Sequence, residues 1–158
     1  MYTMYKLLEA VERMNSTQTT AKKNKIQWNH VSELKNKASV SKFETKYHCS
    51  IPSDLKACIM KYNAGTPVPS LIDFRGNRDK VFGALLSYNA NDLDNIYEFV
   101  ELFQTNNGST LSMIPFGIDP AGNFFCVKDK KIVFYDHETE RALPICSTFT
   151  EFLNMLHN

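Results

Sequence analysis

The stretch that decides the fold is Met113-Ile-Pro-Phe-Gly-Ile-Asp-Pro-Ala-Gly-Asn-Phe-Phe-Cys-Val-Lys-Asp-Lys-Lys-Ile-Val-Phe-Tyr-Asp-His137. Within it lie three short apolar runs, residues 113–118, 123–128 and 131–136. They are too short for helices and rich in β-branched and aromatic residues, which favours strands. A strong turn sequence, Asp119-Pro-Ala-Gly122, separates the first two runs, and a weaker one, Asp129-Lys130, separates the last two. The stretch therefore predicts an antiparallel meander with one buried and one partly solvated face.

Helical spacing of apolar residues predicts the elements on either side of this meander. Helices are expected over residues 3–14, 40–47, 52–62 and 92–104, and from Thr148 onwards. Either Asn63 or Gly65 is expected to adopt the left-handed conformation that ends the third helix. In the fourth helix, Leu93 is expected to face the core with four other apolar residues. Short apolar segments predict strands at 71–74 and 81–87, and residues 66–70 read as a loop.

Helices early in the chain, strands late and a closing helix predict an α+β fold. We expect one domain with an antiparallel sheet of about 4–6 strands flanked by helices. Residues 15–25 contain no apolar residue except Ala21, so residues 1–25 are interpreted as an N-terminal helix and polar linker. The α+β domain is then expected to cover residues 26–158.

Composition places the chain among soluble intracellular proteins. No apolar run approaches the length that spans a bilayer, and charged residues interrupt the N-terminal segment, so no signal peptide is indicated. We therefore expect a cytoplasmic protein without membrane contact. The four cysteines, Cys49, Cys58, Cys126 and Cys146, have no regular spacing, which favours free thiols over disulfides or a zinc site.

Charge is distributed unevenly along the chain, although the formal net charge is only +1. Residues 1–48 carry nine Lys or Arg and four Glu, whereas the remainder carries nine basic and thirteen acidic residues. From Val81 to Asn107 there is no Lys or Arg. Such asymmetry bears on association with a partner, and a direct nucleic-acid binder is expected to be more basic overall.

The predicted helix over 92–104 presents acidic residues away from its apolar side. Asp94, Glu98 and Glu101 are spaced i, i+4, i+7, and Asp92 lies at the start of the helix. These four residues are the candidate docking site for a basic partner, because complementary charge speeds encounter and fixes register. The alternative is an ordinary solvated helix face. Trp28 is a further candidate, either as an interface residue or as a packing anchor.

The sequence offers residues for two other chemistries, a thiol hydrolase site and a metal site. His137, Asp119 and Cys126 could form a thiol hydrolase site, with the imidazole as base and the thiol as nucleophile. However, Cys126 lies in an apolar run with no helix N-terminus to lower its pKa, so an ordinary hydrogen-bonded histidine is favoured. His30, His48 and Cys49 do not have metal-ligand spacing. We expect neither catalysis nor a metal or other cofactor.

Several segments taken together resemble the SUKH superfamily, which includes fungal cell-wall-assembly regulators and bacterial immunity proteins paired with polymorphic toxins. The resemblance covers about Trp28 to His157 and excludes residues 1–25. It rests on the order and spacing of seven segments, Ile51–Lys56, Tyr62–Gly65, Leu85–Ser87, Ile114–Asp119, Gly122–Asn123, Ile132–His137 and Ile145–Leu153. The family's usual Asn-Gly-Gly is Asn63-Ala64-Gly65 here, a local departure in one turn.

The resemblance implies an α+β fold and a binding role without catalysis. In bacteria that role is to neutralise a cognate protein toxin, often a nuclease, whose basic groove the acidic residues could occupy. The alternative is a regulatory interaction module of the fungal type, which binds cellular proteins and has no toxin partner. The resemblance supplies no fixed list of binding residues.

Overall fold

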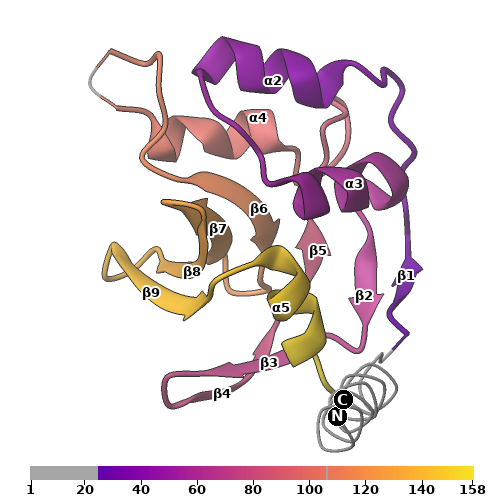
Figure 1. The fold of residues 1–158 in the computed structure, drawn as a ribbon, viewed down its shortest axis with the longest axis vertical. Helices are drawn as coiled ribbons and strands as arrows, with labels where there is room; N and C mark the ends of the chain where they lie inside the picture. The colour runs from indigo at the N-terminus through magenta and orange to yellow at the C-terminus, as the bar shows by residue number, and fades with distance from the viewer. Residues whose placement is uncertain (1–24, 106) are drawn as a thin grey trace, which may run out of the picture.

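The computed structural model describes residues 25–105 and 107–158 (Figure 1). The helix predicted over residues 3–14 and nearly all of the predicted linker lie outside the described residues. The described chain has an α+β fold, and its main element is an antiparallel sheet of five strands in the order β5-β6-β7-β8-β9. These strands are β5 (Ala84–Leu85), β6 (Ile114–Ile118), β7 (Phe124–Lys128), β8 (Lys131–Asp136) and β9 (Arg141–Cys146).

The meander at 113–137 is confirmed as β6, β7 and β8. Cys126 lies opposite Pro115 on one side and Val133 on the other. The first turn is held by the Asp119 carboxylate, which accepts hydrogen bonds from the backbone of Ala121 and Asn123. Asp129 and Lys130 both have left-handed φ, 50° and 63°, so the second hairpin forms a tight turn without Gly or Asn.

Two small antiparallel sheets lie beside the main one. Strand β1 (Gln27–Asn29) pairs with β2 (Thr66–Val68), and β3 (Leu71–Phe74) pairs with β4 (Asn77–Val81). The predicted loop at 66–70 is therefore wrong over its first three residues. Proline at the centre of β2 is compatible with a strand because that strand has a single neighbour, β1.

The helices are α2 (Ser39–Tyr47), α3 (Ser53–Tyr62), α4 (Ile96–Phe99) and α5 (Phe149–Met155), with a 3₁₀ turn η1 (Val100–Phe103) directly after α4. Figure 1 shows α2, α3 and α4 gathered at one end of the molecule, while α5 lies beside β5 and β9. Helix α5 begins as expected, since the Thr148 hydroxyl accepts from the Glu151 backbone at 3.1 Å. The Glu151 carboxylate reaches back to the Ser147 backbone at 3.0 Å.

Phenylalanines from the sheet and from α5 fill the centre of the core. The ring of Phe82 lies 5.1 Å from that of Phe125 and 5.2 Å from that of Phe152, between ring centroids. This packing requires glycine at position 117, because a Cβ there would lie 2.0 Å from a ring carbon of Phe82. The register of β6 against β7 shifts beside this glycine. Aromatic packing therefore fixes how α5 and the segment that follows β4 pack against the sheet.

Three further expectations differ from the structure. The helix expected over 92–104 begins only at Ile96 and changes to 3₁₀ geometry after Phe99, and Leu93 is 92% exposed instead of buried. The strand expected over 81–87 is reduced to β5 and to Val81, the last residue of β4, and β9 was not predicted. Ala64, with φ of 64°, takes the left-handed conformation after α3, whereas Asn63 has φ of −45°. Asn63 is instead committed to buried hydrogen bonds, described next.

Candidate functional site

A buried polar network holds the loop that precedes α4. The Asn63 side chain, 1% exposed, donates to the Ser32 carbonyl at 2.9 Å and to the Ser87 hydroxyl at 3.0 Å. Its carbonyl oxygen accepts from the Tyr88 backbone at 2.9 Å. The Asn89 side chain accepts from the Lys35 backbone at 3.0 Å and donates to the Glu33 carbonyl at 2.9 Å. Each of these groups is satisfied, so the network fixes the loop in one conformation.

Asp92, a predicted partner-binding residue, belongs to this network. Its carboxylate accepts a 2.7 Å hydrogen bond from the Ser87 hydroxyl and a 3.1 Å bond from the Asn89 amide. Hydrogen bonds from Ser32 and then Ser87 hold the pKa of Asp92 below its usual range. The residue is half-buried. Asp92 therefore stabilises the loop, and its carboxylate is not a free docking group.

The other predicted acidic residues are exposed but do not share one helix face. Asp94 has a left-handed φ of 51° and precedes Asn95, whose side chain caps α4. Glu98 lies in α4 and Glu101 in η1, opposite the buried Ile96, Val100 and Phe103. The i, i+4, i+7 helical interpretation is thus wrong for Asp94. The cause is the network at Asp92 and the cap at Asn95, which delay the start of the helix.

Two large apolar side chains accompany these carboxylates. Leu93 is 92% exposed and Leu102 is 63% exposed, so both leucines leave apolar area in solvent. We refer to the exposed residues of this segment as the 93–102 surface, which comprises Leu93, Asp94, Glu98, Glu101 and Leu102. Within the described part of the chain, none of its three carboxylates has an ion-pair partner. Exposed leucines and unpaired carboxylates in one segment offer a partner both apolar contact area and charged groups.

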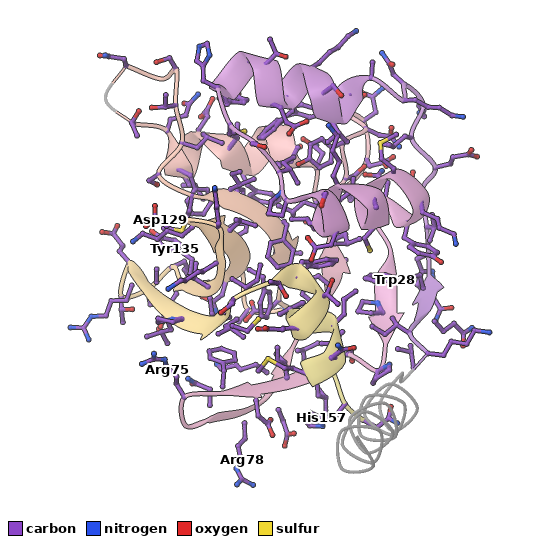
Figure 2. The ribbon with its side chains drawn as sticks, in the orientation of Figure 1. Trp28, Arg75, Arg78, Asp129, Tyr135 and His157 are labelled. Carbon is purple, nitrogen blue, oxygen red and sulfur yellow. The ribbon has the colours of Figure 1, made fainter. Side chains whose placement is uncertain are left out.

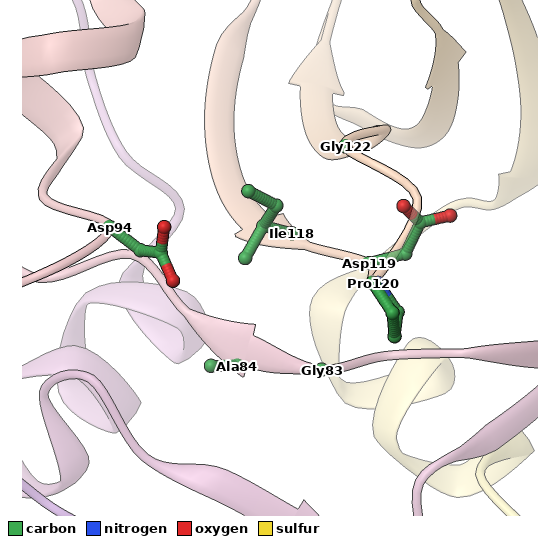
Figure 3. Close-up of a pocket in the computed structure, with 7 residues that line it drawn as sticks. All are labelled: Gly83, Ala84, Asp94, Ile118, Asp119, Pro120 and Gly122. Atoms are coloured by element: carbon green, nitrogen blue, oxygen red, sulfur yellow. The ribbon is translucent and has the colours of Figure 1, made fainter.

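Asp94 also lines a hollow of about 360 Å³ at the end of β5 and β6 (Figure 3). The opposite wall is the Asp119–Gly122 turn, and Ile118 lies between the two walls. The Asp119 carboxylate is occupied by its own turn, where it accepts from the Asn123 backbone and side chain at 2.8 and 3.0 Å. Asp94 therefore provides the free carboxylate of this hollow, and no basic side chain lines it.

Trp28 lies in β1 and packs on α3. Its ring stacks on Tyr62 with centroids 5.4 Å apart and planes inclined by 16°, and the residue is half-buried. Position 65 beside this ring is limited to glycine, because a Cβ there would lie 2.8 Å from the Tyr62 backbone carbonyl oxygen and 3.0 Å from a Trp28 ring carbon. Packing on Tyr62 thus explains why a tryptophan lies at position 28. The exposed part of Trp28 remains a candidate partner contact, and it lies on β1, away from the segment of the 93–102 surface (Figure 2).

The structure does not bring together the residues of the alternative thiol hydrolase site. His137 Nδ1 lies 2.6 Å from the side-chain oxygen of Asn123. The side-chain nitrogen of Asn123 donates a hydrogen bond to the Asp119 carboxylate. Cys126 is fully buried and opposite Val133 in the register, whereas His137 follows the end of β8. Burial raises the pKa of the Cys126 thiol well above its ordinary value, so the nucleophilic thiolate is disfavoured.

Sequence reasoning missed a cluster at the end of the chain. His157 Nε2 lies 3.1 Å from a carboxylate oxygen of Asp73 and 3.8 Å from one of Asp79. The backbones of His157 and Leu71 exchange two hydrogen bonds, of 2.8 and 3.0 Å. The three side chains have metal-ligating atoms within 4.8 Å of one another. The Asp73 carboxylate already contacts His157 Nε2 at 3.1 Å and accepts a hydrogen bond from the Asp79 backbone N–H at 2.7 Å. The cluster joins the β3–β4 hairpin to the end of α5, across 84 residues of sequence, which no local pattern could indicate.

The SMI1 / KNR4 family (SUKH-1) matches residues 36–155. The chain therefore belongs to this family, as its sequence segments indicated. Membership supports a protein-interaction domain of the immunity type, and the family is generally non-catalytic. No curated protein and no solved structure gives a significant match to the chain. Among the described residues, no helix is both long and apolar enough to cross a membrane.

Proposed function

We propose that this protein is an immunity protein that binds a cognate toxin domain through the 93–102 surface and blocks it. Family membership supports the class of function. One observation supports the proposed site. Two exposed leucines lie in the same segment as three carboxylates that form no ion pair among the described residues, and this segment contains no Lys or Arg.

The arrangement suits a partner with apolar pockets bordered by basic groups. Leucine side chains supply the apolar contact area, at about 25 cal/mol per Å² removed from water. The carboxylates then match the partner's basic groups, which raises the association rate and fixes the orientation of the complex. Because the buried network around Asn63 already orders the loop, little conformational entropy is lost when the loop binds.

A nuclease toxin is a class of partner that suits the carboxylates of this surface. Its substrate groove is lined with basic groups that neutralise phosphates, so Asp94, Glu98 and Glu101 can occupy the positions of phosphates. Binding then excludes substrate both by volume and by charge. Asp94 lines the hollow beside β6, which we propose receives a basic side chain of the toxin.

The proposal is tested by capturing partners from the source organism and measuring their affinity. Wild-type protein is compared with the triple variant Asp94→Lys, Glu98→Lys, Glu101→Lys. The control variant changes three other exposed acids by the same total charge, Glu33→Lys, Glu138→Lys and Glu140→Lys. A toxin encoded beside this gene should bind the control like wild type and lose at least about tenfold affinity for the triple variant. Capture of cellular proteins alone, with no toxin gene nearby, would instead support a regulatory module.

A further inference from the structure

A second hollow, of about 400 Å³, lies on the side of the molecule formed by β9 and the β3–β4 and β7–β8 hairpins. Its apolar lining comes from Val133, Pro144 and Ile145. Its polar lining includes three basic side chains, Arg75, Lys128 and Lys131. Figure 2 shows Arg75 at the β3–β4 hairpin and Asp129 at the neighbouring β7–β8 hairpin. This hollow shares no lining residue with the 93–102 surface.

Two of the basic side chains that line this hollow repel one another. Lys128 and Lys131 are direct cross-strand partners at the end of β7 and β8, and both are exposed. Like charges in this position destabilise a strand pair. In the part of the chain that the structure describes, neither lysine nor Arg75 forms an ion pair. The one acidic side chain of the lining is Asp129, so the hollow retains an excess of positive charge.

The elements around this hollow carry most of the basic residues in the second part of the chain. Of the nine Lys and Arg residues between positions 49 and 158, seven lie on β3–β4 or β7–β9. These seven are Arg75, Arg78, Lys80, Lys128, Lys130, Lys131 and Arg141. The same elements also carry six acidic residues, Asp73, Asp79, Asp129, Asp136, Glu138 and Glu140, so the positive excess is confined to the lining of the hollow, where Arg75, Lys128 and Lys131 face one acid, Asp129.

We propose that this hollow binds an acidic, extended segment of a partner protein. Carboxylates of the segment would pair with Lys128, Lys131 and Arg75 and relieve their mutual repulsion, while an apolar side chain would cover Val133 and Ile145. Pro144 removes one backbone donor from β9, which is the last strand of the sheet, so recognition relies on side chains as well as strand pairing. Charge complementarity and the apolar floor together select this occupant.

A protein segment fits better than a nucleic acid. No aromatic side chain lines the hollow, so bases would have no ring to stack on. Three basic groups above an apolar floor also match a short acidic peptide more closely than a continuous phosphate backbone. Binding of nucleic acid is therefore included in the test as the competing outcome.

The test uses fluorescence anisotropy with a short labelled peptide of alternating glutamate and leucine. The comparison probes are the same peptide with glutamine in place of glutamate, and a labelled single-stranded oligonucleotide. The full chain is compared with Lys128→Gln, Lys131→Gln, and with a control that removes the same charge from exposed positions elsewhere, Lys37→Gln, Lys42→Gln. The midpoint of thermal unfolding is recorded for every variant.

Binding of the glutamate peptide should weaken about tenfold in the Lys128/Lys131 variant and stay near wild type in the control. The unfolding midpoint of the Lys128/Lys131 variant should equal or exceed that of wild type, because a repulsive pair is removed. The Asp94, Glu98, Glu101 triple variant should bind the peptide at least as well as wild type, so failure of the toxin proposal leaves this result intact. The proposal is overturned by no peptide binding up to about 1 mM, by equal losses in both double variants, by equal binding of the glutamine peptide, or by tighter binding of the oligonucleotide.

Discussion

The hydroxyl of Ser87 donates a 2.7 Å hydrogen bond to the carboxylate of Asp92, and both belong to the network that fixes the loop before α4. Two positions further on, Asp94 has no such partner in the described chain. Asp92 and Asp94, which look equivalent in the sequence, therefore have different roles. Asp92 maintains the shape of the loop, and Asp94 is available to a partner.

This difference predicts opposite effects of two alanine substitutions. Asp92→Ala should reduce the free energy of unfolding by about 1–3 kcal/mol, because the Ser87 hydroxyl and Asn89 amide lose an acceptor. Asp94→Ala should change it by less than about 0.5 kcal/mol, as is usual for an exposed residue. Denaturant unfolding measures both values. Equal stabilities for the two variants would show that the Asp92 hydrogen bonds contribute nothing.

The turn after α3 predicts a stabilising substitution. Ala64 has a φ of 64°, which glycine adopts without the steric cost of a Cβ. Ala64→Gly should therefore raise the free energy of unfolding by about 1 kcal/mol. Ala57→Gly, at an exposed position inside α3, is the control and should lower it by about 1 kcal/mol. A loss of stability in both variants would contradict the left-handed assignment at position 64.

The contact between His157 and Asp73 predicts a pH-dependent contribution to stability. Hydrogen bonds to Asn158 and then to Asp73 raise the pKa of His157, and bonds from Asp79 and His157 lower the pKa of Asp73. The imidazolium form is thus favoured in the folded state. Its contribution is complete below the unfolded pKa of about 6.5 and disappears as the pH rises through the higher folded pKa.

His157→Gln should accordingly lower the midpoint of thermal unfolding more at about pH 6 than at about pH 9. Below about pH 4 the difference should shrink again, because protonation of Asp73 removes the partner charge. Calorimetry of both proteins across this range provides the measurement. A difference that is constant with pH would show that the imidazolium is not favoured by folding.

Thiol chemistry gives a direct test against a cysteine-dependent activity. Burial raises the pKa of Cys126, and it raises the pKa of Cys58 to about 12 and of Cys146 to about 11. At neutral pH these groups stay as thiols, which react slowly. Iodoacetamide should leave Cys126 unmodified in the native protein and modify it after unfolding, as read by peptide mass spectrometry. Rapid modification of Cys126 in the native state would contradict its assignment to the core.

Elements that depend on local signals could be predicted from the sequence. The Thr148–Glu151 capping pair located the start of α5, and the turn at Asp119–Gly122 located the hairpin between β6 and β7. The helix at 92–104 was misjudged because Leu93 fits the helical apolar period. Hydrogen bonds from Ser87 and Asn89 to Asp92, and from Tyr88 to Asn63, which lies 25 residues earlier in the chain, hold the loop that contains Leu93 outside the helix.

The candidate sites were predictable only in part. The absence of basic residues from 81 to 107 indicated an acidic surface, but the exposure of Leu93 and Leu102 follows from the tertiary fold. The basic hollow was missed because it depends on the Lys128–Lys131 register and on the placement of Arg75 from another sheet. Charge content is visible in a sequence, whereas the convergence of separate hairpins is not.

The measurement that tests the proposed role most directly is hydrogen–deuterium exchange of the protein alone and in complex with its captured toxin. The proposal that the 93–102 surface contacts the toxin predicts slower exchange concentrated in residues 88–103. It also predicts little change in α2, which contributes no residue to the 93–102 surface. Unchanged exchange across 88–103 in a saturated complex would contradict the proposed site, whatever the identity of the toxin.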